Sequence, residues 1–253
     1  MRIFFYYLFI STIMFSCSHK KQLIYLSDVK RGSINKVDLY NENNIEIGDI
    51  LKIDINTVVP QASVPYNNYN KFNTVNNDYL IINGYLVDND SAIHYPILGE
   101  IKAVGFTENE FALNIKRLLV DRGHLNNPHV KVKKVNSKFT ILGEVLRPGT
   151  YNNFDNQLNI FQAIGIAGDL LITAKRKNIT LLREENGLRK TYKFSLNSTD
   201  LFSKPFYYIK SNDVIIIEPN FSKIKSAGFI GSPSSIASIS SLILSLTLLL
   251  INN

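Results

Sequence analysis

The chain has 253 residues, 45% of them hydrophobic, which is enough for one large or two small packed domains and excludes a disordered chain over most of its length. Its 28 Lys and Arg residues exceed its 21 Asp and Glu residues, giving a formal net charge of +7 that would suit nucleic acid, anionic lipid or an acidic polymer. The cations are scattered and no aromatic RNA-reading motif occurs, so the sequence argues against nucleic acid as a partner.

The N-terminus, MRIFFYYLFISTIMFSC, has the outline of a signal peptide: Arg2 precedes an apolar run that ends shortly before Cys17. Cys17 is the only cysteine, which excludes a disulfide within the chain, and the preceding Met-Phe-Ser resembles the bacterial lipobox, where the thiol is acylated. We therefore expect a lipoprotein signal peptide over 1–16. A polar stretch predicts a lipidated tether over 17–44. A free or buried thiol near an uncleaved anchor is the alternative.

Residues 45–136 are predicted to form a first α+β unit. The alternation in IEIGDILKIDI predicts strands around a Gly-Asp turn, and the segment PHVKVKKV predicts a later strand. Between them, Thr107 and Glu110 form a T-x-x-E capping box that predicts a helix start, and Gly123 lies where this helix should end. The side chains expected on its buried face are Phe111, Ile115 and Leu118.

Residues 137–220 are predicted to form a second unit. The strand FTILGEVLRPGTY contains Pro148 and Gly149, which suit the two central positions of a type II turn. The segment NQLNIFQAIGIAGDL predicts a helix that ends at Gly168, and a hairpin is expected to turn at 185–187. We expect a last strand pair in PFYYIKSNDVIIIEP. This order of strands around a short helix is that of a β-grasp.

The segments from IEIGDILKIDI to YYIKSNDVIIIEP resemble the Wza-like outer-membrane polysaccharide export lipoprotein family. The resemblance implies an α+β fold with a polysaccharide export domain over 45–136, one soluble-ligand-binding (SLBB-type) β-grasp domain over 137–220, and a C-terminal transmembrane helix. The residues matching the family's GEV-x-x-PG turn signature are Gly143, Pro148 and Gly149. The longer members have room for more than one β-grasp domain.

The resemblance further implies a homo-oligomeric ring, often an octamer, that passes capsular or extracellular polysaccharide outward without chemistry and without a cofactor. It implies an inner-membrane polysaccharide copolymerase as partner. The expected location is the outer membrane, with a lipid anchor and the body in the periplasm. The main alternative is a periplasmic glycan-binding lipoprotein with a C-terminal membrane anchor.

No residue pattern predicts an enzyme or a metal site. Asp121, His124 and His129 match no common metal-ligand spacing, and neither a P-loop nor an HExxH motif occurs. Glu100 and Glu144 each follow a glycine, as Asp49 does, and these carboxylates could be imagined as an acid pair. We interpret them as turn residues at strand ends, where glycine supplies unusual backbone angles.

The last segment, 221–253, is predicted to hold a linker and a membrane helix that begins after Ser232 and Pro233. A helix over 234–251 would be roughly 27 Å long, sufficient for one span of the thin bacterial outer membrane. The residues expected to line a pore along one helix face are Ser234, Ser238, Ser241, Ser245 and Asn252. A plain anchor, whose serines bond carbonyls of their own helix, is the alternative.

Overall fold

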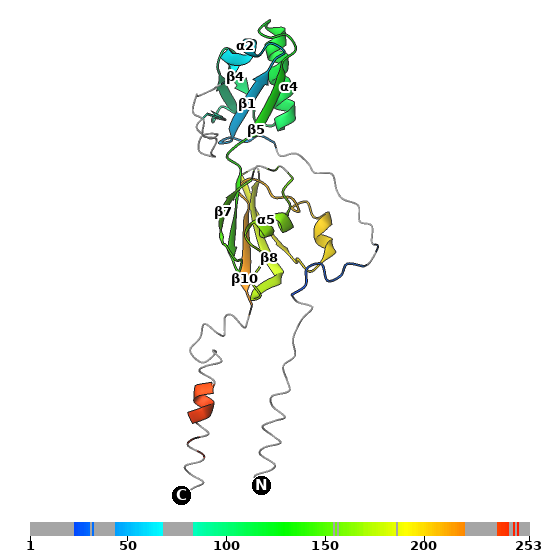
Figure 1. Cartoon of the computed structure of the whole chain (residues 1–253), viewed down its shortest axis with the longest axis vertical. Helices are drawn as coiled ribbons and strands as arrows, with labels where there is room; N and C mark the ends of the chain where they lie inside the picture. Colours follow the sequence, from blue (N-terminus) through cyan, green and yellow to red (C-terminus); the bar gives the residue numbers. More distant parts are fainter. Residues whose placement is uncertain are drawn as a thin grey trace.

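The fold is that of a mixed α/β protein with few helices, seen in a computed structural model (Figure 1). The residues described are 23–30, 32, 44–67, 83–153, 155, 157–185, 187–220, 237–242, 245 and 247. Their buried apolar side chains fall into two clusters, one from residues of the range 45–132 and one from residues of the range 139–217. Each cluster is the core of its own unit.

The first unit combines a small sheet, a hairpin and one long helix. Its elements are β1 (Ile50–Asn56), α2 (Pro60–Ser63), η2 (Val64–Tyr66), β2 (Tyr85–Leu86), β3 (Ala92–Tyr95), β4 (Gly99–Lys102), α4 (Glu108–Asp121) and β5 (His129–Lys134). Strand β1 lies between β2 and β5 and is antiparallel to both, while β3 and β4 form a separate antiparallel pair. The predicted strand before the Gly-Asp turn is wrong, because the chain becomes a strand only at Ile50.

Helix α4 confirms the predicted capping box. The Thr107 side chain accepts from the backbone N–H of Glu110, and the Glu110 carboxylate accepts from that of Thr107. Hydrogen bonds to the Glu110 carboxylate lower its pKa. The helix ends before Gly123, whose φ of 70° is left-handed, as predicted. Leu119, not Leu118, completes the buried face with Phe111 and Ile115.

The second unit is a five-stranded sheet with a short helical layer on one side (Figure 1). Its elements are β6 (Lys138–Gly143), β7 (Gly149–Asn152), α5 (Ile160–Ile166), β8 (Ala174–Glu185), β9 (Leu188–Phe194), η3 (Thr199–Ser203) and β10 (Val214–Pro219). The strand order is β7-β6-β10-β8-β9, in which the β6–β10 pair is parallel and the other pairs are antiparallel.

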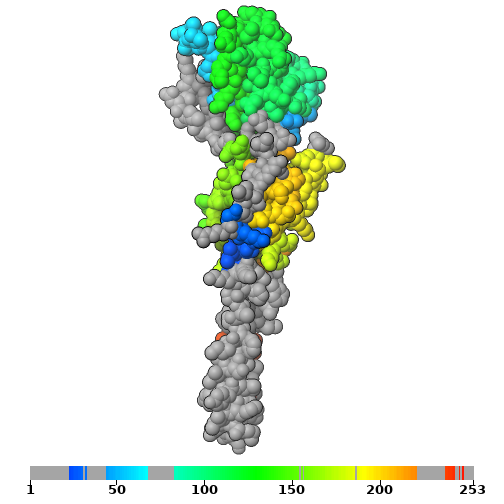
Figure 2. Space-filling view, turned by 90° about the vertical axis from the view of Figure 1, so that its right-hand side faces the viewer, coloured from blue at the N-terminus to red at the C-terminus, as the bar shows by residue number. Residues whose placement is uncertain are grey.

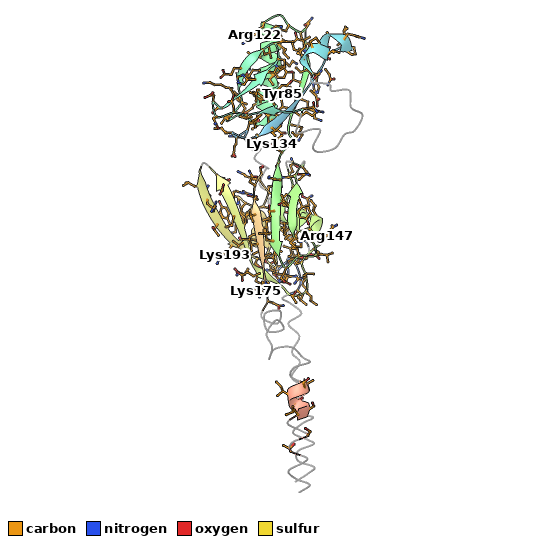
Figure 3. All side chains as sticks on the ribbon, turned by 90° about the vertical axis from the view of Figure 1, so that its left-hand side faces the viewer. Tyr85, Arg122, Lys134, Arg147, Lys175 and Lys193 are labelled. Atoms are coloured by element: carbon orange, nitrogen blue, oxygen red, sulfur yellow. The ribbon has the colours of Figure 1, made fainter. Side chains whose placement is uncertain are left out.

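Alternation along the strands gives this sheet one buried and one open face. Ile215 and Ile217 of β10 and Ile141 of β6 are buried against α5 and η3, which contribute Ile164 and Leu201 to the same core. The neighbouring side chains on each strand point to the other face, which no described helix or strand covers (Figure 3). The predicted hairpin at 185–187 is confirmed, whereas the predicted last strand pair is wrong because only β10 forms there.

The predicted C-terminal helix lies mostly outside the described residues. Residues 237–242 are helical, and their side chains are exposed. Among the residues that the structure describes, no helix combines the length and the apolar character needed to cross a membrane.

Candidate functional site

The turn after β6 is built on Gly143. Its φ is 95°, and a Cβ placed there would lie 1.9 Å from the backbone oxygen of Ile217 on β10. The next residue, Glu144, donates its N–H to that same oxygen over 3.0 Å. Glycine at this position therefore lets the chain leave the central strand pair while passing directly against β10.

Pro148 and Gly149 do not form the predicted type II turn. Gly149 lacks the positive φ that the second central position requires, and it instead begins β7 opposite Ile141. The positive φ of the signature lies at Gly143, six positions earlier in the chain. The three signature residues thus frame one connection between β6 and β7, with the tightest backbone approach at its start.

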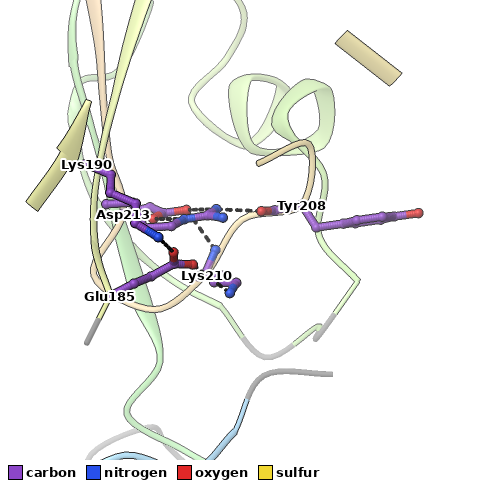
Figure 4. A network of polar contacts seen from close by, with 6 residues as sticks. Glu185, Lys190, Tyr208, Lys210 and Asp213 are labelled. Carbon is purple, nitrogen blue, oxygen red and sulfur yellow. Dashed lines mark hydrogen bonds and ion pairs between the residues drawn. The ribbon is translucent and has the colours of Figure 1, made fainter. Parts of the chain in front are cut away.

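A buried ion pair fixes the chain just before β10 (Figure 4). The Arg183 Nε and Nη2 atoms donate to the two Asp213 carboxylate oxygens over 2.8 and 2.6 Å, and both side chains are almost fully buried. Arg183 Nη2 also donates to the carbonyl of Tyr208, and the Tyr208 ring points away from the network. Burial raises the pKa of Asp213, and its hydrogen bonds from Arg183 act in the opposite direction.

A second ionic contact lies beside this pair and closes the β8–β9 hairpin onto the same loop (Figure 4). The Glu185 carboxylate accepts from Lys190 over 2.7 Å and from Lys210 over 2.8 Å. These hydrogen bonds lower the pKa of Glu185 to about 2. The network stabilises a loop at the position where the sequence predicted a second strand, and its role is structural.

Residues 23–30, which we call the N-terminal strap, pack on the second unit. The backbone N–H of Leu26 donates to the carbonyl of Leu196 over 2.9 Å. The carboxylate of Asp28 accepts from the backbone N–H of Thr199 and from the hydroxyl of Ser198 at the start of η3. The backbone hydrogen bond from Thr199 is the main cause that lowers the pKa of Asp28.

Tyr25 is the aromatic anchor of the strap. Its ring meets Phe161 of α5 edge-on at 6.2 Å, and the Arg176 guanidinium lies 5.7 Å from the ring centroid. Its hydroxyl donates to Asp169, and burial followed by this hydrogen bond raises the pKa of Tyr25 to about 12. Within the segment 17–44 predicted as a tether, residues 23–30 therefore pack on the second unit, and the apolar run LIYL was the signal that we missed.

The other predicted site residues are only partly described. Cys17, Ser234 and Asn252 lie outside the described residues, as does the whole segment 1–22. Ser238, Ser241 and Ser245 are exposed. The hydroxyls of Ser241 and Ser245 donate to the carbonyls three residues earlier. This is the intrahelical bonding expected of serines in an apolar helix.

The carboxylates considered for acid chemistry do not come together. Asp49 forms an ion pair with Lys134 over 2.6 Å in the first unit, Glu144 accepts from the Thr173 hydroxyl in the second, and Glu100 is exposed on β4. His124 packs edge-on against the Tyr66 ring at 6.0 Å. Within the described residues, no group of three or more potential metal ligands occurs. The arrangement offers structural ion pairs and docking surfaces.

Comparison with known proteins identifies the first unit. Residues 39–134 match the family model described as polysaccharide biosynthesis/export protein. Residues 39–134 therefore hold a domain of this family, which supports the resemblance of the sequence to Wza-like exporters. Members of this family are export proteins of the periplasm and outer membrane that handle polysaccharide.

Proposed function

We propose that the chain is an outer-membrane subunit of a ring-forming exporter that passes capsular or extracellular polysaccharide from the periplasm to the cell surface. The observation that carries this proposal is the family match over residues 39–134. The proposed subunit moves the polymer without altering it covalently. A polysaccharide copolymerase of the inner membrane would supply the polymer to the first unit.

The topology of the second unit supports this proposal. The order β7-β6-β10-β8-β9, with a parallel central pair and a short helix after the first hairpin, is the arrangement expected of a β-grasp domain. We assign it to the soluble-ligand-binding type, which in the resembling family stacks into rings. One such domain beside one export domain would give a shorter periplasmic body than in the longer members.

Two attachments to the membrane complete the proposal. Acylated Cys17 would insert in the inner leaflet of the outer membrane, and the apolar C-terminal segment would cross it outward with its serines facing a lumen. The strap supports the first attachment, because it holds the chain close behind Cys17 against the second unit through Tyr25 and Asp28. A pull on the lipid anchor would therefore act on a folded body.

The test is the mass of the full chain extracted in detergent, compared with a variant that ends at Gly231. We expect a ring for the full chain and loss of membrane insertion on truncation. A full chain that is monomeric and binds glycan would contradict the exporter and favour a glycan-binding lipoprotein. Replacing Cys17 by Ser should produce a population of the protein that is released from the membrane, with the folded body unchanged.

A further inference from the structure

The open face of the second-unit sheet carries an apolar centre. Val214 and Ile216 of β10 point to this face, with Leu182 of β8 opposite Val214 and Leu142 of β6 opposite Ile216. Leu142 is 43% exposed, and the other three are partly exposed. We call these four side chains the sheet patch. They sit on the central β6–β10 pair of the sheet.

Cations outnumber carboxylates around the sheet patch, where Lys175 is paired with Glu218 over 2.9 Å and Arg189 with Glu184 over 2.5 Å. Lys193 of β9, which is opposite Thr180, and Lys138 of β6 are exposed beside it, and Figure 3 shows Lys193 and Lys175 on this side of the sheet. Threonines 140, 150, 180 and 191 fill the intervening positions. An uncharged centre within a charged rim is the composition of a protein interface.

The opposite side of the unit has complementary chemistry. The strap and η3 lie there, seen face-on in Figure 2 as the blue and amber surfaces. Tyr25, Phe161, Phe202 and Tyr207 form a chain of ring contacts at 5.6 to 6.4 Å and remain partly exposed. We call them the aromatic patch. Exposed carboxylates of Asp28, Asp169 and Asp200 surround it, and Asp200 is paired with Lys204 over 2.7 Å.

We propose that the sheet patch of one copy of this chain packs against the aromatic patch of the next copy. Aliphatic side chains would meet aromatic rings, and the lysine rim would meet the aspartates. The two patches lie on opposite faces of one two-layer unit, so the contact cannot satisfy itself within a pair and must repeat head to tail. Such a heterologous contact closes into a ring when the rotation between copies allows it.

This inference rests on the proposed ring and assigns the surfaces that build it. It also gives the strap a second role, since Tyr25 and Asp28 would belong to the interface as well as to the fold. The aromatic rings alone would also suit stacking against sugar rings. The charge complementarity between the two faces favours another copy of the chain as the occupant.

The first test replaces Leu142 by Asp and measures the mass of the full chain in detergent. The position is exposed, so the subunit should fold, while a carboxylate would stand at the centre of the contact beside partner aspartates. Leu188→Asp is the matched control, since Leu188 is 66% exposed at the start of β9 and outside the patch. We expect at least a tenfold loss of assembled protein for Leu142→Asp and none for the control. An intact ring of Leu142→Asp overturns this inference and leaves the exporter standing; a monomeric wild type overturns both.

The second test joins the two faces chemically. A chain carrying both Lys193→Cys and Asp200→Cys places one thiol on each side of the sheet, so a short bifunctional maleimide can link them only between copies. We expect a ladder of cross-linked dimers, trimers and larger species. Each single variant should lack this ladder, and because each also contains Cys17 it controls for cross-linking through that thiol. A ring of normal mass that gives no ladder above the single variants contradicts the proposed contact.

Discussion

Replacing Gly143 by Ala tests the closest approach to another backbone atom found for any glycine in the described part of the chain. The added Cβ would lie 1.9 Å from the Ile217 oxygen and 2.9 Å from its carbonyl carbon, and both are backbone atoms of β10. Real Cβ atoms essentially never come within 3.0 Å of a non-bonded atom of another part of the chain, so either β6 or β10 must move. Both strands belong to the central parallel pair, and the displacement cannot be absorbed by a flexible side chain.

The expected loss of stability has several sources. A left-handed φ costs a residue with a Cβ about 1 to 2 kcal/mol. The hydrogen bond from Glu144 to Ile217, which the added Cβ would disturb, is worth about 1 kcal/mol. Shifting packed strands costs roughly 1 to 3 kcal/mol more. We therefore expect Gly143→Ala to lower the free energy of unfolding of the second unit by about 4 kcal/mol. Urea titration followed by far-ultraviolet circular dichroism measures this change.

The matched control is Gly165→Ala in α5. Beyond its chain neighbours and the backbone of its own helix, no atom lies within 4 Å of a Cβ at that position, and its φ is not left-handed. Alanine should therefore stabilise the helix by about 0.5 to 1 kcal/mol. The two substitutions are chemically identical and should have opposite signs. If the free energy of unfolding of Gly143→Ala lies within about 1 kcal/mol of the wild-type value, the close approach of β6 and β10 that we describe is wrong.

Three further predictions concern the polar contacts of the second unit. Arg183→Met leaves the Asp213 carboxylate buried without its cationic partner and should lower the free energy of unfolding in urea by about 3 to 5 kcal/mol. Most of this loss should be recovered when Asp213 is also replaced by Leu. An equal loss in the single and the double variant would count against a buried ion pair. Tyr25→Ala should loosen the strap by about 2 kcal/mol, so that hydrogen exchange of the Leu26 amide is ~30-fold faster with the rest of the unit unchanged; unaltered exchange would show that the ring does not hold the strap. The folded-state pKa of Glu185 is lowered from 4.5 to about 2, so Glu185→Gln should lower the free energy of unfolding by about 0.5 to 1 kcal/mol above pH 4.5. This difference between variant and wild type should shrink as the pH falls toward 2. A difference that grows with acidification would refute the pairing.

Local chemistry predicted the elements whose ends are encoded by neighbouring residues. The capping box of Thr107 and Glu110 set the start of α4, and the left-handed glycines 123 and 168 follow the ends of α4 and α5. The start of α5 was missed by a few residues, although Asn159 and Gln162 form a second capping box that the N-x-x-Q spacing shows. These signals act over three or four residues and are therefore readable from sequence.

Contacts between distant residues account for the failures. The loop before β10 looked like a strand because of its tyrosines, yet Arg183 and Asp213, 30 positions apart, fix it in another form. The strap looked like part of a tether because its partners Phe161, Asp169 and Thr199 lie more than 130 positions away. The type II turn failed for a related reason, since the proximity of β10 determines which glycine of the signature is left-handed.

The measurement that tests the central claim most directly is the distribution of polysaccharide in cells that lack this protein. The amounts at the cell surface and in the periplasm are compared in the deletion, in cells complemented with the wild type, and in cells complemented with Leu142→Asp or Leu188→Asp. The exporter account predicts loss of surface polymer and its accumulation in the periplasm in the deletion, restored by the wild type and Leu188→Asp only. Surface polymer that is unchanged in the deletion would contradict it.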